Sequence, residues 1–357
     1  MAGETTPAVR GTRPTIAIAG QDDTPLSDGL VDLRIEEDVD GLFHCEATFG
    51  NWGPKDGTTT FLYFDRSKLD FGKDIQVKVG GDAIFKGRVT GIEARFPEGS
   101  PPVMAVLAED RLQELRMTRR TRTFADVTDS AVINQIATDH GLTPNVSVSG
   151  PRHRILAQLN QSDLAFVRER ARAIDAEVWI DGADLHAASH TGRSGGKVRL
   201  GWGNELRELS LLADLAEQRT NVRVTGWDVA AKDTLTATAT DSVLGGELAG
   251  KDSGPSVLGS ALAERKETVA HALPLTADEA RARAEALLKR RARRFVSGRG
   301  TAETTAGLRA GATATLDGLG PLFSGDFYVT AVKHLFDARR GLRTDFHVER
   351  PGLGRPR

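Results

Sequence analysis

The sequence contains a single cysteine, Cys45, among its 357 residues. One cysteine excludes an intrachain disulfide and fits a protein assembled in a reducing compartment. Cys45 lies on the apolar side of the alternating run Phe43-Cys45-Ala47-Phe49. This position predicts a small buried hydrophobic side chain and not a reactive thiol.

Long hydrophobic runs and a strong charge of one sign are also missing. No run of about 18 uncharged apolar residues is present to span a bilayer, and Met1 to Pro14 lacks the apolar segment of a secretory signal. The formal net charge of −2 gives no bulk attraction to nucleic acid or to anionic membranes. We therefore expect a protein made in the cytoplasm, with no nucleic-acid partner and no stable membrane insertion.

What the sequence does contain is an internal repeat. In the first copy Ile84-Phe85-Lys86-Gly87 is followed by Val89-Thr90-Gly91-Ile92 and reaches Phe96; in the second Leu322-Phe323-Ser324-Gly325 is followed by Val329-Thr330-Ala331-Val332 and reaches Phe336. Each copy follows a glycine-opened alternating segment, Gly72 to Gly80 or Gly311 to Gly318, and the next extended run ends near Glu109 or Glu349. A repeat at so long a separation predicts two related β-modules and not a short-period solenoid.

Composition and periodicity extend this prediction to the whole chain. Hydrophobic residues at 39% and charged residues at 27% are typical of a globular protein long enough for two or three domains. Alternating runs separated by Gly, Pro and Asp predict strands that close into a barrel or small sandwich. We predict an α+β, β-dominated fold with the following parts: a flexible arm at 1–13, a first β-barrel module at 14–118, a small α/β insert at 119–205, and a second β-barrel module at 206–357 with a helix near 277–295.

Three helices carry recognisable start signals. Asp129 to His140 has an apolar side, with Thr128 as the candidate N-cap and Gly141 as the stop, and Ser162 to Asp175 has a second apolar stripe. The third helix begins with Thr276-Ala277-Asp278-Glu279, which fits a capping box. Strands are expected at 177–180 and near Leu185, and the segment from Asn51 to Asp65 is either a long loop or a strand pair with a large connection.

The candidate chemical motifs are weak. Gly245-Gly246-Glu247-Leu248-Ala249-Gly250-Lys251-Asp252 resembles a P-loop, but Asp252 stands where a Ser or Thr should hold magnesium. We therefore interpret the glycine-rich stretch from Gly245 to Ser256 as a mobile loop. His186 and His190 have metal-ligand spacing, yet Ala187 replaces the glutamate of zinc proteases. The basic run from Lys289 to Arg299 favours a packed helix with an outward basic side. We nominate no catalytic, cofactor-binding or metal-binding residue, and we expect no enzyme and no cofactor.

Four ordered segments resemble the phage tail protein D family, also called late control protein D, which is related to the N-terminal region of VgrG spike proteins. They are Arg119 to Phe124 with the helix up to Leu142, Gln158-Leu159-Asn160-Gln161-Ser162-Asp163-Leu164-Ala165-Phe166, Gly318 to Thr330, and Arg343 to Arg350. Together with the repeat they cover most of the chain from about residue 30 to 350.

The resemblance implies the central baseplate hub of a contractile injection system: a phage tail, a tailocin or an extracellular injection particle. Members of this family are homotrimers with two tube-like β-barrels per subunit, and they adapt the hexameric inner tube to the trimeric spike. VgrG proteins continue into a needle domain, whereas this sequence stops at Arg357, which leads us to expect a separate spike protein. Other baseplate proteins are further expected partners, and the tail or particle is the expected location.

Two other functions remain open at this stage. A tail-associated cell-wall hydrolase would need a concave site with convergent titratable groups. A transcription regulator would need a helix-turn-helix with a basic recognition face, and no such pattern is visible.

Overall fold

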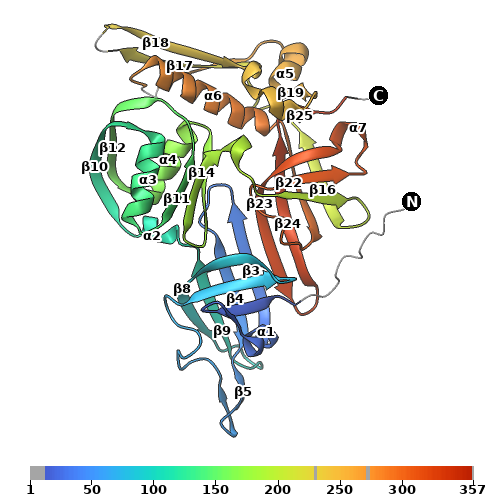
Figure 1. The fold of residues 1–357 in the computed structure, drawn as a ribbon. Coiled ribbons are helices and arrows are strands. Elements are labelled where there is room, and N and C mark those ends of the chain that lie inside the picture. The colour runs from blue at the N-terminus through green and yellow to red at the C-terminus, as the bar shows by residue number, and fades with distance from the viewer. Residues whose placement is uncertain (1–12, 229–230, 271–273, 356–357) are drawn as a thin grey trace.

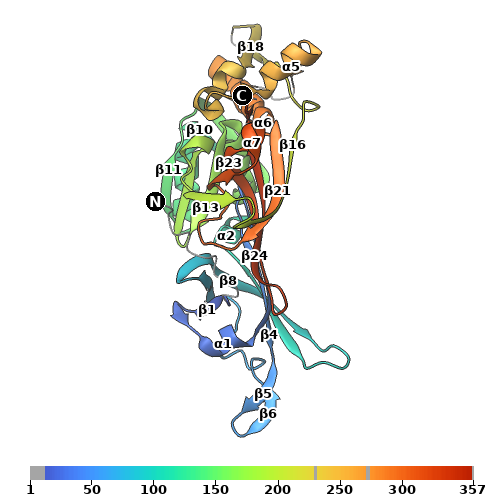
Figure 2. The same cartoon turned by 90° about the vertical axis from the view of Figure 1, so that its right-hand side faces the viewer.

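The computed structural model describes residues 13–228, 231–270 and 274–355. The predicted flexible arm, 1–13, lies outside the described residues apart from Arg13. The described chain is elongated, with four hydrophobic cores arranged along it (Figures 1 and 2). The β-dominated α+β class predicted from the sequence is confirmed.

The first part of the chain forms module 1, which lies at the lower end of Figure 1. Its elements are β1 (Thr15–Ile18), β2 (Gln21–Asp22), α1 (Thr24–Gly29), β3 (Leu30–Asp38), β4 (His44–Gly50), β5 (Trp52–Lys55), β6 (Thr58–Phe61), β7 (Asp74–Val79), β8 (Asp82–Arg95) and β9 (Val103–Glu109). Strands β5 and β6 form a hairpin that projects at the tip, so residues 51–65 do contain a strand pair, but the tight turn Asp56-Gly57 joins the strands and the expected large connection is wrong.

The insert follows and packs its own core between helices and short sheets. It consists of α2 (Gln113–Arg116), β10 (Arg119–Thr128), α3 (Asp129–Asp139), β11 (Thr143–Ser147), β12 (Arg152–Ser162), α4 (Asp163–Ala173), β13 (Ala176–Asp181), β14 (Asp184–Ser189) and the 3₁₀ turn η1 (His190–Gly192). The Thr128 and Ser162 hydroxyls accept hydrogen bonds from Ala131 N and Ala165 N, as expected of N-caps.

Module 2 contains the strands at the C-terminal end of the chain. It consists of β15 (Lys197–Gly201), β16 (Leu206–Ala213), β21 (Val296–Glu303), β22 (Thr313–Asp317), α7 (Gly320–Phe323), β23 (Gly325–Asp337) and β24 (Gly341–Arg350).

A separate cap layer lies over one end of module 2 (top of Figure 1). It consists of β17 (Asn221–Asp228), β18 (Asp233–Thr240), η2 (Asp241–Leu248), β19 (Asp252–Ser253), α5 (Gly254–Leu262), β20 (Lys266–Val269), α6 (Ala277–Arg293) and β25 (Gly352–Leu353). Strands β18, β17 and β20 form their own sheet, which packs on α6. The stretch interpreted as a mobile loop, 245–256, contains part of η2, strand β19 and the start of α5, so that interpretation is wrong.

The two modules share one sheet of 13 strands. Its main path runs β16-β21-β24-β23-β3-β4-β9-β8-β7-β1-β2, with β15 and β22 branching from β23. Module 1 thus joins module 2 by direct pairing of β3 with β23. Within the described residues the sheet is open and neither module closes into a barrel on its own.

The internal repeat is present in the structure as a repeat of strand register. In module 1, β8 and β9 pair Val89 with Ala108 and Gly91 with Leu107, so that Thr90 forms a bulge. In module 2, β23 and β24 pair Val329 with Val348 and Ala331 with His347, so that Thr330 forms the same bulge. The amide of Gly72 donates to Val89 O, and that of Gly311 donates to Val329 O, both at 2.8 Å.

One half of the sequence alignment of the repeat is wrong. Val89–Ile92 does correspond to Val329–Val332, but Ile84 and Phe85 lie in β8 whereas Leu322 and Phe323 lie in α7. The reason is that a tight turn at Gly80-Gly81 joins β7 to β8, while the connection from β22 to β23 contains this extra helical turn. Gly87, which pairs with Ile75, therefore corresponds to Phe327, which pairs with Ala314.

No helix in the described ranges is long and apolar enough to cross a membrane.

Candidate functional site

The two modules are joined by the antiparallel pairing of β23 with β3. The second half of β23 pairs with β3 from Ala331 opposite Asp38 to Asp337 opposite Asp32. Just before the paired segment, the amide of Val39 donates to Thr330 O at 3.0 Å. The bulge at Thr330 thus marks where β23 changes its neighbour from β22 to β3.

The junction is closed by buried side chains on one face. Val332, His334 and Phe336 of β23 are 3%, 0% and 5% exposed, and they lie beside the fully buried Leu33 and Ile35 of β3. Burial lowers the pKa of His334 to about 3, so its imidazole is neutral, and its Nδ1 lies 2.8 Å from the Thr344 hydroxyl. The junction is therefore a hydrophobic interface inside one chain.

The corresponding strand of module 1 has an uncovered edge. Strand β8 pairs with β7 only through Arg88, so in the described structure nothing pairs with residues 91–95 on that side. Phe96, the counterpart of Phe336, is 63% exposed and forms an aromatic cluster with Trp52 and Phe61 of the hairpin and with Phe64.

The counterpart of β3 is β16, and it too has an uncovered edge. The pairing of β3 with β4 skips Val31, between Leu30–Phe49 and Asp32–Thr48, and the pairing of β16 with β21 skips Arg207 in the same way. Leu209 and Leu211 therefore correspond to Leu33 and Ile35. The side of β16 that faces away from β21 has no strand neighbour among the described residues, and Leu212 beside it is 60% exposed.

Sequence analysis missed the β16 edge although a signal was available. Leu30-Val31-Asp32-Leu33-Arg34-Ile35 and Leu206-Arg207-Glu208-Leu209-Ser210-Leu211 share apolar and acidic positions. This second part of the repeat is short, and Arg207 and Ser210 stand where the first copy has Val31 and Arg34, which explains why it is hard to see without the register.

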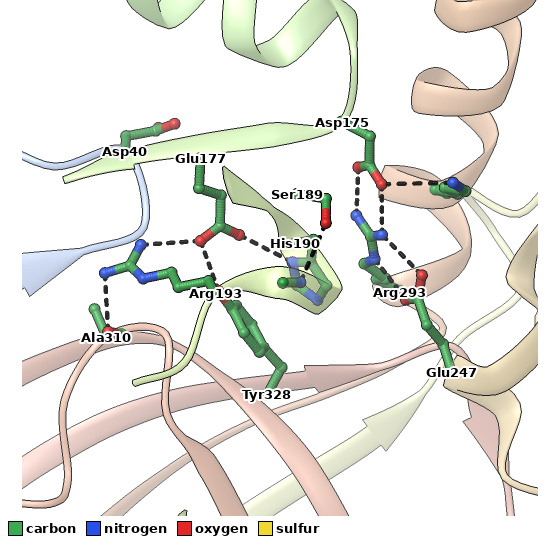
Figure 3. A network of polar contacts seen from close by, with 12 residues as sticks. Asp40, Asp175, Glu177, Ser189, His190, Arg193, Glu247, Arg293, Ala310 and Tyr328 are labelled. Carbon is green, nitrogen blue, oxygen red and sulfur yellow. Dashed lines mark hydrogen bonds and ion pairs between the residues drawn. The ribbon is translucent and has the colours of Figure 1, made fainter. Parts of the chain in front are cut away.

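The insert is fastened to module 2 by a buried polar network (Figure 3). Glu177 of β13 accepts hydrogen bonds from Arg193 Nη1 at 2.9 Å and from the Tyr328 hydroxyl of β23 at 2.6 Å, and its other oxygen lies 2.9 Å from His190 Nδ1. Burial alone raises the pKa of Glu177, but these cationic and hydroxyl partners outweigh it and hold the carboxylate ionised. Arg193 also donates to Ala310 O, which extends the network into the loop before β22.

Arg293, at the end of α6, forms a second fastening. Its guanidinium is 3% exposed and binds both oxygens of Asp175 in the insert, at 2.5 and 2.7 Å, as well as Glu247 of η2. The same helix begins with the predicted N-cap Thr276, but Glu279 accepts from Leu275 N and not from the cap amide. The basic run of α6 therefore does not point uniformly outward, because Arg293 is used inside the protein.

A buried histidine links α6 to the insert at the other end of the helix. His153 Nε2 lies 2.9 Å from Asp129 Oδ2, and its Nδ1 lies 2.7 Å from Glu279 Oε1. Burial alone lowers the pKa of His153, but the two carboxylates outweigh it and raise the pKa above the ordinary value. Arg170, which donates to Asp129 Oδ1 at 2.6 Å, completes the cluster.

A cleft of about 1020 Å³ separates α4 of the insert from α6. Its walls carry arginines from both helices, among them Arg168 and Arg172 of α4 and Arg283 and Arg290 of α6. The two helices are nevertheless in direct contact, because Arg290 Nη1 of α6 donates to Arg172 O of α4 at 2.7 Å. Carboxylates of the same cleft, Asp175, Glu177 and Glu267, are engaged in ion pairs. The charge here serves to fix the joint between insert and module 2.

The remaining sequence candidates are placed by the structure as follows. His186 lies in β14 and stacks on Trp179 with ring centroids 5.2 Å apart, whereas His190 belongs to the Glu177 network. No group of three or more potential metal-ligating side chains occurs within the ranges the structure covers. Cys45 is 2% exposed, as predicted.

The sequence matches a family model over residues 15–337 that is described as the Alg8 N-terminal domain. The chain belongs to the Alg8 N-terminal domain family. This is a different family model from the late control protein D family that the sequence motifs resemble. No curated protein matches the sequence.

Solved structures that share this fold include tail proteins and a chain of a VgrG complex. The 43 kDa tail protein of prophage MuSo2 from Shewanella oneidensis is 14% identical, with 95% of this chain and 98% of that chain covered and a TM-score of 0.66. A tail protein from Neisseria meningitidis MC58 is 12% identical, with 96% and 98% covered and a TM-score of 0.67. A chain of the Francisella PdpA–VgrG complex is 10% identical, with 99% and 60% covered and a TM-score of 0.53.

Proposed function

We propose that this protein is the structural central hub of the baseplate of a contractile injection system, such as a phage tail, a tailocin or an extracellular injection particle. In this role it is a homotrimer that adapts the hexameric inner tube to a trimeric spike. The proposal is supported by the fold that the chain shares with phage tail proteins and with a chain of a VgrG complex.

The observation that carries the proposal is the duplicated register of β8–β9 and β23–β24, including the bulges at Thr90 and Thr330. A subunit with two equivalent modules lets three subunits present six similar surfaces to a hexameric ring. The same trimer retains true threefold symmetry, which suits a trimeric spike. A monomeric hydrolase would gain nothing from two equivalent modules.

For this role we divide the chain into an arm at 1–13, a first module at 14–118, an insert at 119–205 and a second module at 206–357. Across these bounds α2 packs on the insert core and β15 pairs with β22 of the second module. The inner tube protein and a separate spike protein are the proposed axial partners, and other baseplate proteins surround the hub. Two carboxylates of the cleft are engaged at the joint between the insert and module 2, Asp175 with Arg293 and Glu177 with the Tyr328 hydroxyl, which favours a structural role over an enzymatic one.

The proposal is tested by the mass of the purified protein in solution, alone and mixed with the spike protein of the same particle. The expected result is a threefold multiple of 38.4 kDa that also binds the spike. A protein that stays monomeric both alone and with the spike contradicts the proposal.

A further inference from the structure

We propose that copies of this chain join edge to edge, with residues 91–96 at the end of β8 pairing in antiparallel fashion with residues 209–214 of β16 in the next copy. This inference rests on the proposed trimer and adds the surface and the register by which it is held together. The partner is a second copy of this chain.

The template for this contact is the junction inside the chain. Going from module 2 to module 1, β23 corresponds to β8 because Val329–Val348 and Ala331–His347 match Val89–Ala108 and Gly91–Leu107. The correspondence continues through the next strands to the outer one, where the skipped residues Val31 and Arg207 align β3 with β16. In module 2 the edge of β23 is paired with β3. The equivalent edge of β8 in module 1 is therefore the expected pairing site for β16 of another copy.

The register transfers residue by residue. Ala331 opposite Asp38, His334 opposite Ile35 and Phe336 opposite Leu33 define the internal junction. Their counterparts give Gly91 opposite Asp214, Ala94 opposite Leu211 and Phe96 opposite Leu209. The internal hydrogen bond from Val39 N to Thr330 O likewise corresponds to one from Leu215 N to Thr90 O across the copies.

Burial supports the same pairing. Phe336 is 5% exposed because β3 covers it, whereas Phe96 is 63% exposed on an edge that lacks this cover. The β16 edge presents Leu209, Leu211 and the exposed Leu212, and an uncovered strand edge with apolar side chains is a ready template for another strand. Pairing in the transferred register would place Phe96 beside Leu209, as Phe336 is placed beside Leu33.

The two edges are different surfaces, so the contact is head to tail and must close into a ring or grow into a filament. Each copy already contains one module-to-module step of this kind, at β23 and β3. If the β8–β16 contact between copies has the geometry of the internal β23–β3 contact, it relates neighbouring modules by the same rotation. Closure after six modules gives the trimer.

The test is disulfide trapping with Arg95→Cys and Ser210→Cys in one chain, which stand opposite each other in the proposed register. Leu335 opposite Arg34 is the internal equivalent of this pair, so Leu335→Cys with Arg34→Cys is the positive control within one chain. Arg95→Cys with Glu208→Cys is the shifted control, because two residues along a strand add about 7 Å, beyond the reach of a disulfide. Native Cys45 is buried, and the single-cysteine variants give the background.

Under mild oxidation the matched pair is expected to link most chains into covalent trimers, while the shifted pair and the single cysteines do not. The mass of the unoxidised protein is measured in the same samples. A trimer whose matched pair fails to link, although the internal control closes, overturns this register and leaves the proposed hub intact. A trimer that links the shifted pair as well as the matched pair also overturns it. A protein that remains monomeric, alone and with the spike, overturns both.

Discussion

Modules 1 and 2 share the bulged pairing of β8 with β9 and of β23 with β24, but these strands have different neighbours. In module 2 the second half of β23 is covered by β3, whereas in module 1 no described strand pairs with the second half of β8. Module 1 alone carries the β5–β6 hairpin, and it places β1 antiparallel to β7, whereas β15 is parallel to β22. Where two copies of one design differ in exposure, the difference identifies a surface that another molecule can cover.

The modules also differ in how their cores are filled at equivalent positions. Gly300 of β21 stands where β4 has Ala47, and the strand beside it carries Phe346 where module 1 has Val106. A Cβ at Gly300 would lie 2.8 Å from the Phe346 ring. A small residue beside a large one in module 2 thus replaces two of intermediate size in module 1.

The largest expected difference between the modules comes from the paired phenylalanines. Phe336→Ala removes a side chain that is 5% exposed in the junction core and is expected to lower the free energy of unfolding by about 4 kcal/mol. Phe96→Ala removes its exposed counterpart and is expected to cost less than about 1 kcal/mol while weakening the trimer. Chemical denaturation and solution mass of both variants measure the contrast. Equal losses of stability would show that the two positions are not in the different environments described.

The attachment of the insert to each module gives the next contrast. Arg293→Ala leaves the buried Glu247 without its cation and leaves Asp175 with only Lys289, at 3.9 Å, so we expect a loss of about 3 kcal/mol. Lys86→Ala removes the ion pair between module 1 and Asp181, whose partners are 43% and 64% exposed, and we expect less than about 0.5 kcal/mol. Chemical denaturation followed by circular dichroism measures both. If the Lys86 variant were the weaker protein, the insert would depend mainly on module 1.

Exchanging core residues between the modules is expected to have a smaller effect. Gly300→Ala is expected to cost about 2 kcal/mol because the new methyl group meets Phe346 and the Glu208 carbonyl oxygen. Adding Phe346→Val recreates the module 1 combination and should recover part of that loss, so the double variant should be less destabilised than the sum of the two single variants. Additive losses in this double-mutant cycle would mean that the two positions do not share one packing constraint.

The smallest effect is a pH dependence confined to the joint between the insert and α6. The pKa of His153 is raised in the folded protein, so its contribution is fully present below the ordinary histidine pKa and is lost as the pH rises through the folded value. For one proton the slope cannot exceed about 1.4 kcal/mol per pH unit. The free energy of unfolding of the wild type should fall in this alkaline window relative to that of His153→Gln. Parallel pH curves for the two proteins would contradict a charged His153.

Sequence reasoning found the local elements because their signals are local. Thr128 and Thr276 begin helices where a hydroxyl is followed by apolar periodicity, and these two N-caps are confirmed. The helix expected from about Ser162 also begins there, with Ser162 as its N-cap. The Val-Thr-Gly-Ile and Val-Thr-Ala-Val segments were correctly matched because a bulge requires the same local spacing in both copies. The separate cap sheet on α6 was missed, since alternation in β17 and β18 does not say which sheet they join.

The uncovered edge of β8 at residues 91–96 could not be predicted from the sequence for a different reason. Whether Phe96 is covered depends on a strand about 110 residues away in sequence, and no local pattern records that distance. Arg293 was assigned to an outward basic side because helix periodicity is blind to a carboxylate supplied by the insert. Both features became visible only from contacts between distant segments.

The hairpin β5–β6 is present in module 1, and β21 runs into β22 without one. In the proposed ring every second module would carry this hairpin. A partner that contacts only the strands common to both modules would find six similar binding positions, whereas a partner that binds the hairpin would find three. The exposed rings of Trp52 and Phe61 would then determine at which of the six module positions a neighbouring protein binds.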